Sequence, residues 1–337
     1  MANSIRIAAS LAAALLLSGC ETLSYYLQAV GGQLDLMARS QPVDRLLADP
    51  ATPPALRDRL ELSRSIRDFA ARELKLPDNA SYRGYADLGR PYVVWNVVAA
   101  PEFSVEPVQS CFPVAGCVSY RGFFAREDAE RHAAKLKGAG SDVFVYGVPA
   151  YSTLGRFDDP LLSTFIRYAD AELARLVFHE LAHQVVYVKD HSTFNESFAV
   201  AVEREGVRRW LAASQRSAQL ADFLAVQERN RKFLDEIDQV RARLKAIYGM
   251  SLSSEEMRTR KAVELEPLRA RLQANARFSG QAPNNALLAS FSTYTQLVPM
   301  FEKLLAEEGG DLARFYERVR KLSIEPSSRG PSSGPSR

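Results

Sequence analysis

The chain has 337 residues, of which 47% are hydrophobic and 25% charged, so it is long enough and apolar enough to bury a substantial globular core. Its 43 basic and 40 acidic residues leave a formal net charge of only +3. No cluster of basic residues has aromatic residues interleaved with it, which argues against a nucleic-acid partner.

Residues 1–20 are typical of a secretory signal peptide. Arg6 is followed by eleven apolar or small residues, IAASLAAALLL, and then by a small-residue segment. Eleven residues form a helix of only about 17 Å, too short to cross about 30 Å of hydrocarbon. The ending LSGC resembles the lipobox of bacterial lipoproteins, which implies a lipid on Cys20; the alternative is an ordinary signal with an incidental cysteine. We therefore expect a lipid-anchored protein of the bacterial cell envelope that faces the periplasm.

The two other cysteines, Cys111 and Cys117, predict a disulfide. The intervening FPVAG contains a proline and a glycine, which can reverse the chain and bring two Cα atoms within bridging distance. In an oxidising compartment such a pair usually bridges. The alternative is a pair of free, buried thiols.

The remaining pattern predicts an α+β fold that is predominantly helical. Strand-like runs indicate a small, mostly antiparallel sheet, and they cover residues 91–100, 118–124 and 142–148. Helical periodicity covers residues 24–48, 54–77, 126–138, 213–248, 253–276, 283–307 and 310–322. The segments on either side of Gly249 predict a long helical hairpin, which forms an insertion over about 213–276. We expect the tail, 326–337, to be disordered because its composition is low in complexity.

Three of the four histidines lie within thirteen positions of an otherwise buried-looking helix. His179 and His183 are four residues apart, so they project from one face, one turn apart, and can bind a single metal ion. Glu180 lies about 100° round the helix, where its carboxylate can reach a water on that ion without binding the ion itself. This H-E-x-x-H pattern is typical of zinc hydrolases. The alternative is a buried helix whose histidines are only hydrogen-bonded.

A catalytic zinc site of this kind needs a third protein ligand and leaves a fourth position open. The segment NESFA, residues 195–199, resembles the N-E-x-F-A motif of gluzincin aminopeptidases, which implies that Glu196 is that ligand. His191 is the alternative. Glu203 lies seven residues past Glu196 on the same face, where it could hydrogen-bond and orient an imidazole.

Four segments together resemble a family of predicted bacterial aminopeptidases, which are zincin-type and often lipoproteins: PVAGCVSYRGFF, DVFVYGVPAYSTLGRFDDPLLSTF, FHELAHQVVYVKDHSTFNESFA and NNALLASFSTYTQLVPMF. The resemblance spans about residues 30–325. It implies a zincin-like metallopeptidase domain over 21–325 that acts on peptides and holds one Zn²⁺ per chain. The family's metal ligands fall on His179, His183 and Glu196, and its base on Glu180.

The implied reaction is peptide hydrolysis by a metal-activated water. Zinc lowers the pKa of its bound water toward about 7, and Glu180 takes the proton and passes it to the leaving amine. The oxyanion needs a donor besides the metal. Tyr294 is the first candidate and Tyr151 the second, and the alternative for either is a half-buried core tyrosine. We expect the segment 142–155 to hold an extended substrate by edge pairing.

Two other functions fit the same residues. One is a catalytically inactive zincin-fold lipoprotein that binds a protein partner through the 213–276 hairpin, although an intact Glu180 argues against it. The other is a zinc amidase or endopeptidase acting on cell-wall peptides. An aminopeptidase also needs a carboxylate for the substrate's α-ammonium group, and the candidates are Glu203, Glu205, Asp158 and Asp159.

Overall fold

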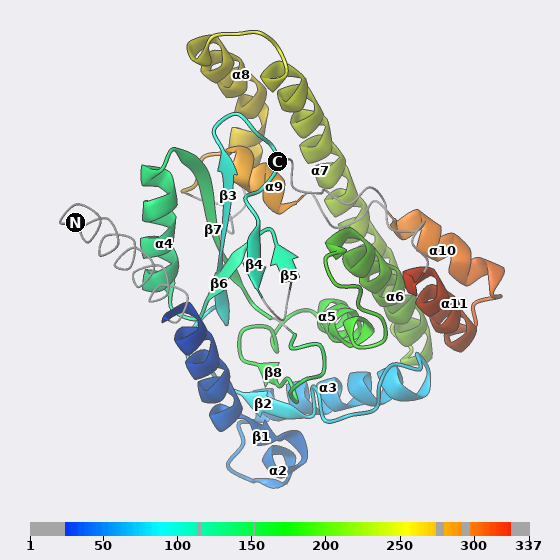
Figure 1. Ribbon diagram of the computed structural model, residues 1–337. Helices are drawn as coiled ribbons and strands as arrows, with labels where there is room; N and C mark the ends of the chain where they lie inside the picture. Colours follow the sequence, from blue (N-terminus) through cyan, green and yellow to red (C-terminus); the bar gives the residue numbers. More distant parts are fainter. Residues whose placement is uncertain (1–23, 113–115, 151, 274–279, 292–296, 325–337) are drawn as a thin grey trace, which may run out of the picture.

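The computed structural model describes residues 24–112, 116–150, 152–273, 280–291 and 297–324. A small sheet with α4 lies on one side of the molecule, and the helices α5, α6, α10 and α11 lie on the other (Figure 1). The described chain is predominantly helical with a sheet rich in antiparallel pairs, which confirms the predicted α+β class. No described helix combines the length and the apolar composition that a membrane span requires.

The main sheet has the order β6-β3-β7 and is antiparallel throughout. Its strands are β6 (Arg121–Phe123), β3 (Val94–Pro101) and β7 (Ser141–Val148). Successive side chains of a strand point to opposite faces, and both faces are covered. On one face, Val97 and Val143 pack with α4 (Arg126–Gly138). On the other, Val98 and Phe144 pack with α9 (Asn285–Ser290) and the helical hairpin.

Two smaller strand groups complete the β-structure. The hairpin of β4 (Ser110–Phe112) and β5 (Gly116–Val118) projects from the main sheet. A second sheet has the order β1-β2-β8 and includes the parallel pair β2–β8; its strands are β1 (Gln41–Pro42), β2 (Gly84–Ala86) and β8 (Leu161–Leu162). These short strands were not expected from sequence, and the strand predicted over 118–124 is divided between β5 and β6 by a bend at Ser119.

The N-terminal helices differ from the prediction at a proline. The expected helix over 24–48 is split into a helix over 24–39 and α2 (Val43–Ala48), with β1 between them. Pro42 has no N–H and disfavours helical geometry in the residue before it, so the chain leaves the helix here. α3 (Pro54–Arg72) ends five residues before the predicted boundary.

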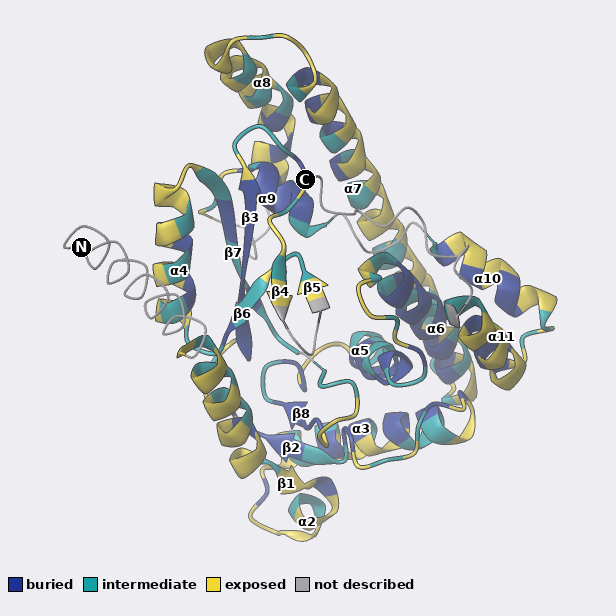
Figure 2. Ribbon diagram, viewed as in Figure 1, coloured by how far each residue is buried: buried dark blue, intermediate teal, exposed yellow. Residues whose placement is uncertain are grey.

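The predicted helical hairpin is present as α7 (Ala218–Tyr248) and α8 (Ser254–Gln273). It extends away from the rest of the molecule, and its outer end is largely exposed (Figure 2). The helix predicted over 283–307 consists of α9 and α10 (Val298–Glu307), with residues outside the described part between them. α11 (Leu312–Ile324) follows.

Two buried helices form the centre of the helical half (Figure 2). They are α5 (Asp170–His183) and α6 (Ser192–Ala213). Their close approach depends on Gly206 of α6, where a Cβ atom would lie 2.8 Å from both the Phe178 ring and a Leu74 methyl carbon. Phe178 is fully buried, so neither partner has room to move. Because protein cores are close-packed, these contacts fix the position of the last turn of α5 relative to α6.

Candidate functional site

The last turn of α5 carries two facing imidazoles. The Nε2 atoms of His179 and His183 are 3.2 Å apart, and the two rings are perpendicular with centroids separated by 4.8 Å. Residues four apart on a helix are neighbours on its surface, so the structure places these rings as the H-E-x-x-H spacing predicts. Two nitrogen donors therefore point at one another instead of at solvent.

The start of α6 brings a carboxylate to the same point. Glu196 Oε2 lies 3.3 Å from His179 Nε2, and Oε1 lies 3.7 Å from His183 Nε2. The adjacent Asn195 is buried and fixes the loop from α5, because its side chain accepts a hydrogen bond from Val188 N and donates one to Val188 O, both at 2.8 Å. α6 begins at Ser192, and no side chain caps its first turn.

These three residues form a donor set suited to zinc. One ligating atom from each of His179, His183 and Glu196 lies within 4.8 Å of the other two. Two imidazoles and one carboxylate are a recurrent set in catalytic zinc sites, which keep a fourth position open. His191, the alternative ligand, is not part of the group; it occupies the position just before α6.

A buried ion-pair network orients His179. Glu203 is only 3% exposed, and its Oε2 accepts a hydrogen bond from His179 Nδ1 at 2.8 Å. The same oxygen accepts from Arg175 Nη1 at 3.0 Å. An acceptor on Nδ1 keeps the Nε2 lone pair directed at a metal, which is the role expected for Glu203 from sequence. His183 differs, since the described residues offer its Nδ1 no partner.

The electrostatics of the cluster favour one positive charge between the rings. Burial alone would lower the pKa of His179, but hydrogen bonds to Glu196 and Glu203 outweigh it and raise that pKa. Burial, with the charge of His179, lowers the pKa of His183. In spite of burial, the two histidines keep the pKa of Glu196 below its usual range, and Arg175 and His179 do the same for Glu203. A divalent cation between the same donors would meet this preference for positive charge.

Glu180 lies beside the cluster, where its proton affinity is increased. Burial raises the pKa of Glu180 to about 7; Glu196 and Asp159 act in the same direction, and His179 opposes them. A carboxyl group with a pKa near neutrality can accept a proton and return it. The structure thus puts Glu180 next to the donor set without making it a member.

Three tyrosines surround this cluster, and sequence reasoning missed all of them. Tyr82 is 2% exposed, has a left-handed backbone with φ of 62°, and has its pKa raised by burial and by the charges of Glu180 and Asp159. The pKa of Tyr187 is raised by partial burial and by nearby charges that include Glu196. Tyr120 is 39% exposed, and its pKa is raised with the charge of Glu196 among the causes. Only the position of Tyr187, four residues past His183, gives a sequence signal. The predicted donors Tyr294 and Tyr151 lie outside the described residues.

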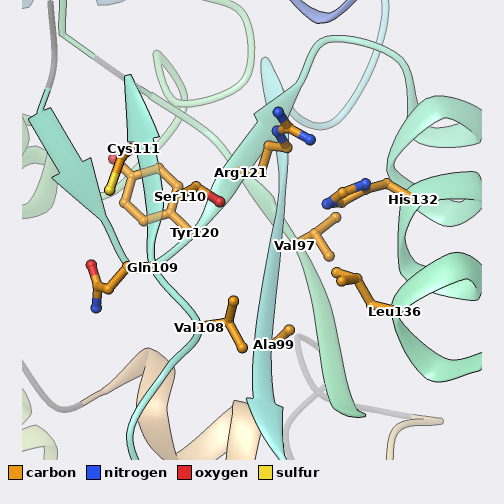
Figure 3. A pocket seen from close by; sticks show the side chains of 10 residues that line it. All are labelled: Val97, Ala99, Val108, Gln109, Ser110, Cys111, Tyr120, Arg121, His132 and Leu136. Atoms are coloured by element: carbon orange, nitrogen blue, oxygen red, sulfur yellow. The ribbon is translucent and has the colours of Figure 1, made fainter. Parts of the chain in front are cut away.

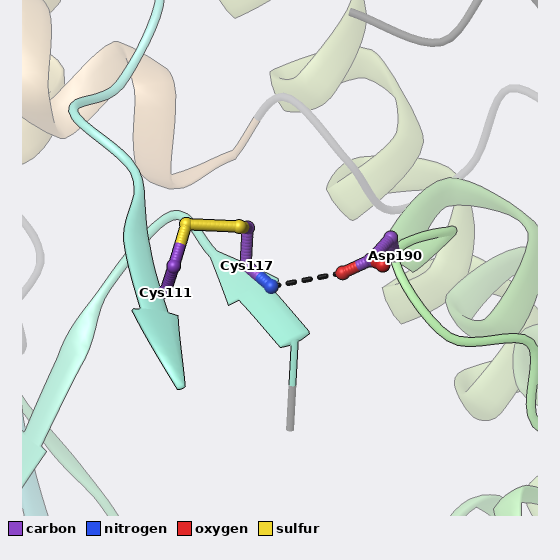
Figure 4. The surroundings of a disulfide bond; sticks show 3 residues. All are labelled: Cys111, Cys117 and Asp190. Atoms are coloured by element: carbon purple, nitrogen blue, oxygen red, sulfur yellow. Dashed lines mark hydrogen bonds between the residues drawn. A yellow bond between two sulfur atoms is a disulfide. The ribbon is translucent and has the colours of Figure 1, made fainter. Parts of the chain in front are cut away.

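The disulfide lies against the loop that joins the two ligand-bearing helices. Cys111 and Cys117 are bonded to each other, as predicted, and Cys117 N donates a hydrogen bond to Asp190 Oδ1 at 2.8 Å (Figure 4). Asp190 precedes α6 and has a left-handed φ of 64°. No sequence pattern indicated this contact, because 73 residues separate the two groups.

A cavity of about 270 Å³ lies on the other side of the same hairpin. Its wall combines β3, β4, β6 and α4, and the lining includes Cys111, Tyr120, Arg121 and His132 (Figure 3). Tyr120, in this lining, is also a residue whose pKa the charge of Glu196 raises.

Most of the carboxylates considered for binding an α-ammonium group are already engaged. Glu203 is bound to His179 and an arginine, and Glu205 pairs with two arginines. Asp159 is 3% exposed and accepts hydrogen bonds from the loop at 152–153. Asp158 is exposed.

The outer edge of β7 is partly covered. Gln281 accepts from Val145 N at 3.4 Å and donates to Val145 O at 2.7 Å, which imitates a neighbouring strand. An extended peptide therefore cannot pair with Val145 unless Gln281 moves, which corrects the expectation for the whole segment 142–155. Backbone groups alternate in direction along a strand, so the next outward pair belongs to Gly147.

Removing the support of His179 should weaken metal binding. We expect Glu203→Ala to bind zinc roughly 10- to 100-fold more weakly, the usual scale for loss of a hydrogen bond behind a ligand. Competition with a chromogenic chelator measures the change. Glu205→Ala is the matched control, because Glu205 lies on the same helix and pairs with two arginines but not with His179. Wild-type affinity in Glu203→Ala would show that this hydrogen bond does not support the ligand.

Comparison with known proteins agrees with these features. No curated protein and no solved structure matches the chain. A family model described as "Putative aminopeptidase" matches residues 24–330. The match covers most of the chain and includes both ligand-bearing helices and the disulfide hairpin. The chain therefore belongs to this aminopeptidase family, as its motifs indicated.

Proposed function

We propose that the protein is a zinc-dependent aminopeptidase of the cell envelope. The observation that carries the proposal is the convergence of His179, His183 and Glu196 from two tightly packed helices, with their donor atoms within 4.8 Å of one another. Glu180 lies next to this group, and Glu203 supports it from behind. A structural metal site needs neither a base nor an open position. Membership of the aminopeptidase family supports a peptide substrate.

Each residue of the site has a separate role in the proposed hydrolysis. His179, His183 and Glu196 would hold Zn²⁺, which supplies Lewis acidity for a water and for the scissile carbonyl when bound. Glu180 accepts a proton on its carboxylate and donates it to the leaving amine. Glu203 keeps the proton of His179 on Nδ1, so that the lone pair of Nε2 remains available to a metal ion.

A tyrosine hydroxyl completes the proposed chemistry by donating to the developing oxyanion. Tyr294 remains our first candidate and Tyr151 the second, on the sequence alone. Tyr187 is a third candidate from the structure, because its ring meets the ring of His183 edge-on at 6.4 Å and is 44% exposed.

We also propose that Cys20 carries a lipid and that the mature chain is attached to a membrane facing the periplasm. The support is the LSGC sequence at the end of the apolar segment. A disulfide between Cys111 and Cys117 agrees with an oxidising compartment.

One observation favours a second function, cleavage away from a free N-terminus. Three of the four carboxylates that could bind an α-ammonium group are already paired or hydrogen-bonded. A zinc endopeptidase or amidase on cell-wall peptides needs no such carboxylate.

Digestion of a peptide library in matched free and N-acetylated forms tests these functions. We expect hydrolysis that a chelator abolishes and zinc restores, together with a clear preference for free N-termini. Equal cleavage of both forms would favour the endopeptidase. If zinc-loaded protein cleaves no peptide in either form, the remaining hypothesis is an inactive protein that binds a partner through the 213–276 hairpin.

A further inference from the structure

The helix over residues 24–39 presents an apolar stripe to solvent. At about 100° per residue, Leu27, Val30, Leu34 and Met37 fall within an arc of roughly 80°. Their exposed fractions are 64%, 56%, 59% and 40%. The other exposed large hydrophobic side chains are mostly scattered singly over the described residues, as is normal for a soluble surface. A stripe on one helix face needs a separate explanation.

The opposite face of this helix is firmly packed, so the stripe cannot simply turn inward. The Gln28 side chain donates a hydrogen bond to Gly122 O of β6 at 3.4 Å. It also accepts one from the backbone N of Phe124, the residue after β6, at 3.1 Å. Gly32 leaves room for the Phe124 ring, which occupies the space where a Cβ would be. Leu36 is 3% exposed and belongs to the main core. These contacts set the rotation of the helix about its axis.

The exposed side carries no net charge. The charged residues of the helix, Asp35 and Arg39, lie about 120° and 160° round from the centre of the stripe, and they pair with each other at 2.9 Å. Helices that bind anionic surfaces electrostatically carry several Lys or Arg residues on the polar face, and this segment has only Arg39. Any partner must therefore be recognised through apolar contact.

The position of the stripe in the chain identifies the partner. Leu27 is seven residues from Cys20, so it lies at most about 25 Å from it even along a fully extended backbone. If acyl chains on Cys20 enter a bilayer, the stripe is held within reach of that bilayer's surface. Tethering at this distance favours the contact, because binding of the stripe to that bilayer then becomes an intramolecular event.

We propose that the helix over 24–39 lies along the membrane that holds the lipid on Cys20, with Leu27, Val30, Leu34 and Met37 in the headgroup–acyl boundary. This inference rests on the proposed acylation but not on the peptidase activity. It orients the protein, because the face that packs on β6 turns the sheet and the histidine cluster away from the bilayer. Contact through apolar area does not depend on anionic lipid or on salt.

Depth-dependent quenching tests the orientation. The acylated chain is prepared as Leu34→Cys, labelled with an environment-sensitive fluorophore and reconstituted into phosphatidylcholine vesicles containing brominated lipid. We expect several-fold stronger quenching than for the control Leu224→Cys on α7, whose parent side chain is similarly exposed at 54%. Quenching should be unchanged when phosphatidylglycerol is added. Equal quenching at both sites, with acylation of Cys20 verified by mass spectrometry, overturns the inference.

A second measurement does not require the lipid. The mature chain with Cys20→Ser should bind the same vesicles weakly, and Leu27→Ser with Leu34→Ser should reduce that binding at least about tenfold, given the apolar area removed. Leu224→Ser with Val263→Ser is the matched control, and peptide hydrolysis should stay unchanged in both double variants. If the stripe instead forms a dimer that sediments as such without vesicles and dissociates in the stripe variant, the inference is wrong.

Discussion

Glu180→Gln is expected to lower peptide turnover by roughly 10² or more, the usual scale for loss of a general base. Zinc content and melting temperature should stay near wild type. Gln keeps the volume of the side chain and removes only its ability to accept a proton. Burial raises the pKa of Glu180 from 4.5 to about 7, so the wild-type fold loses stability as the pH rises between these values, and Gln does not ionise. The two melting temperatures should therefore agree best below about pH 5, and the variant should not melt below wild type at higher pH. Steady-state kinetics, elemental analysis and thermal unfolding measure the three quantities.

Glu172→Gln is the control for this experiment. Glu172 lies in the first turn of the same helix and pairs with Arg175 at 2.8 Å. Its replacement should leave turnover close to wild type. If Glu180→Gln hydrolyses peptides as fast as wild type, Glu180 is not the base.

Glu196→Ala should lose its zinc. The third ligand supplies an oxygen at the point where the two Nε2 atoms meet, so its removal leaves two donors where a catalytic site needs three. We expect affinity to fall by more than the roughly 10- to 100-fold of a supporting residue, and hydrolysis to fall with it. Elemental analysis after dialysis and chelator titration measure the loss.

His191→Ala is the comparison that decides the ligand. It should retain one zinc per chain and its activity, because His191 is outside the donor group. Zinc retained in Glu196→Ala but lost in His191→Ala would transfer the ligand role to His191 and require a different loop conformation.

The donor set was predictable because each part of it rests on local geometry. The spacing of His179 and His183 fixes their relation on any helix, and the NESFA segment follows within a short loop. The α+β class and the long hairpin follow from periodicity in the same way. Pro42 was a local signal for the end of the first helix, and the prediction of one helix over 24–48 missed it.

What sequence could not give are contacts between distant segments. The pKa of Tyr82 responds to the charge of Glu180, although Tyr82 lies in a turn almost a hundred residues earlier, with a left-handed backbone that no pattern predicts. Asp190 meets the disulfide hairpin, and Gln281 covers the edge of β7, only through tertiary packing. Each depends on which surfaces meet after folding, and periodicity carries no information about that.

The glycine contact between α5 and α6 has a consequence for how His179, His183 and Glu196 are held together. Gly206 lies one turn from Glu203 on α6, and it touches Phe178, the neighbour of His179 on α5. The spacing of the two helices therefore depends on a missing methyl group beside the buried side chains of Phe178 and Leu74. A larger residue at position 206 would push α6 away from α5 and carry Glu196 away from the two imidazoles, so a position that touches none of the three residues controls whether they converge.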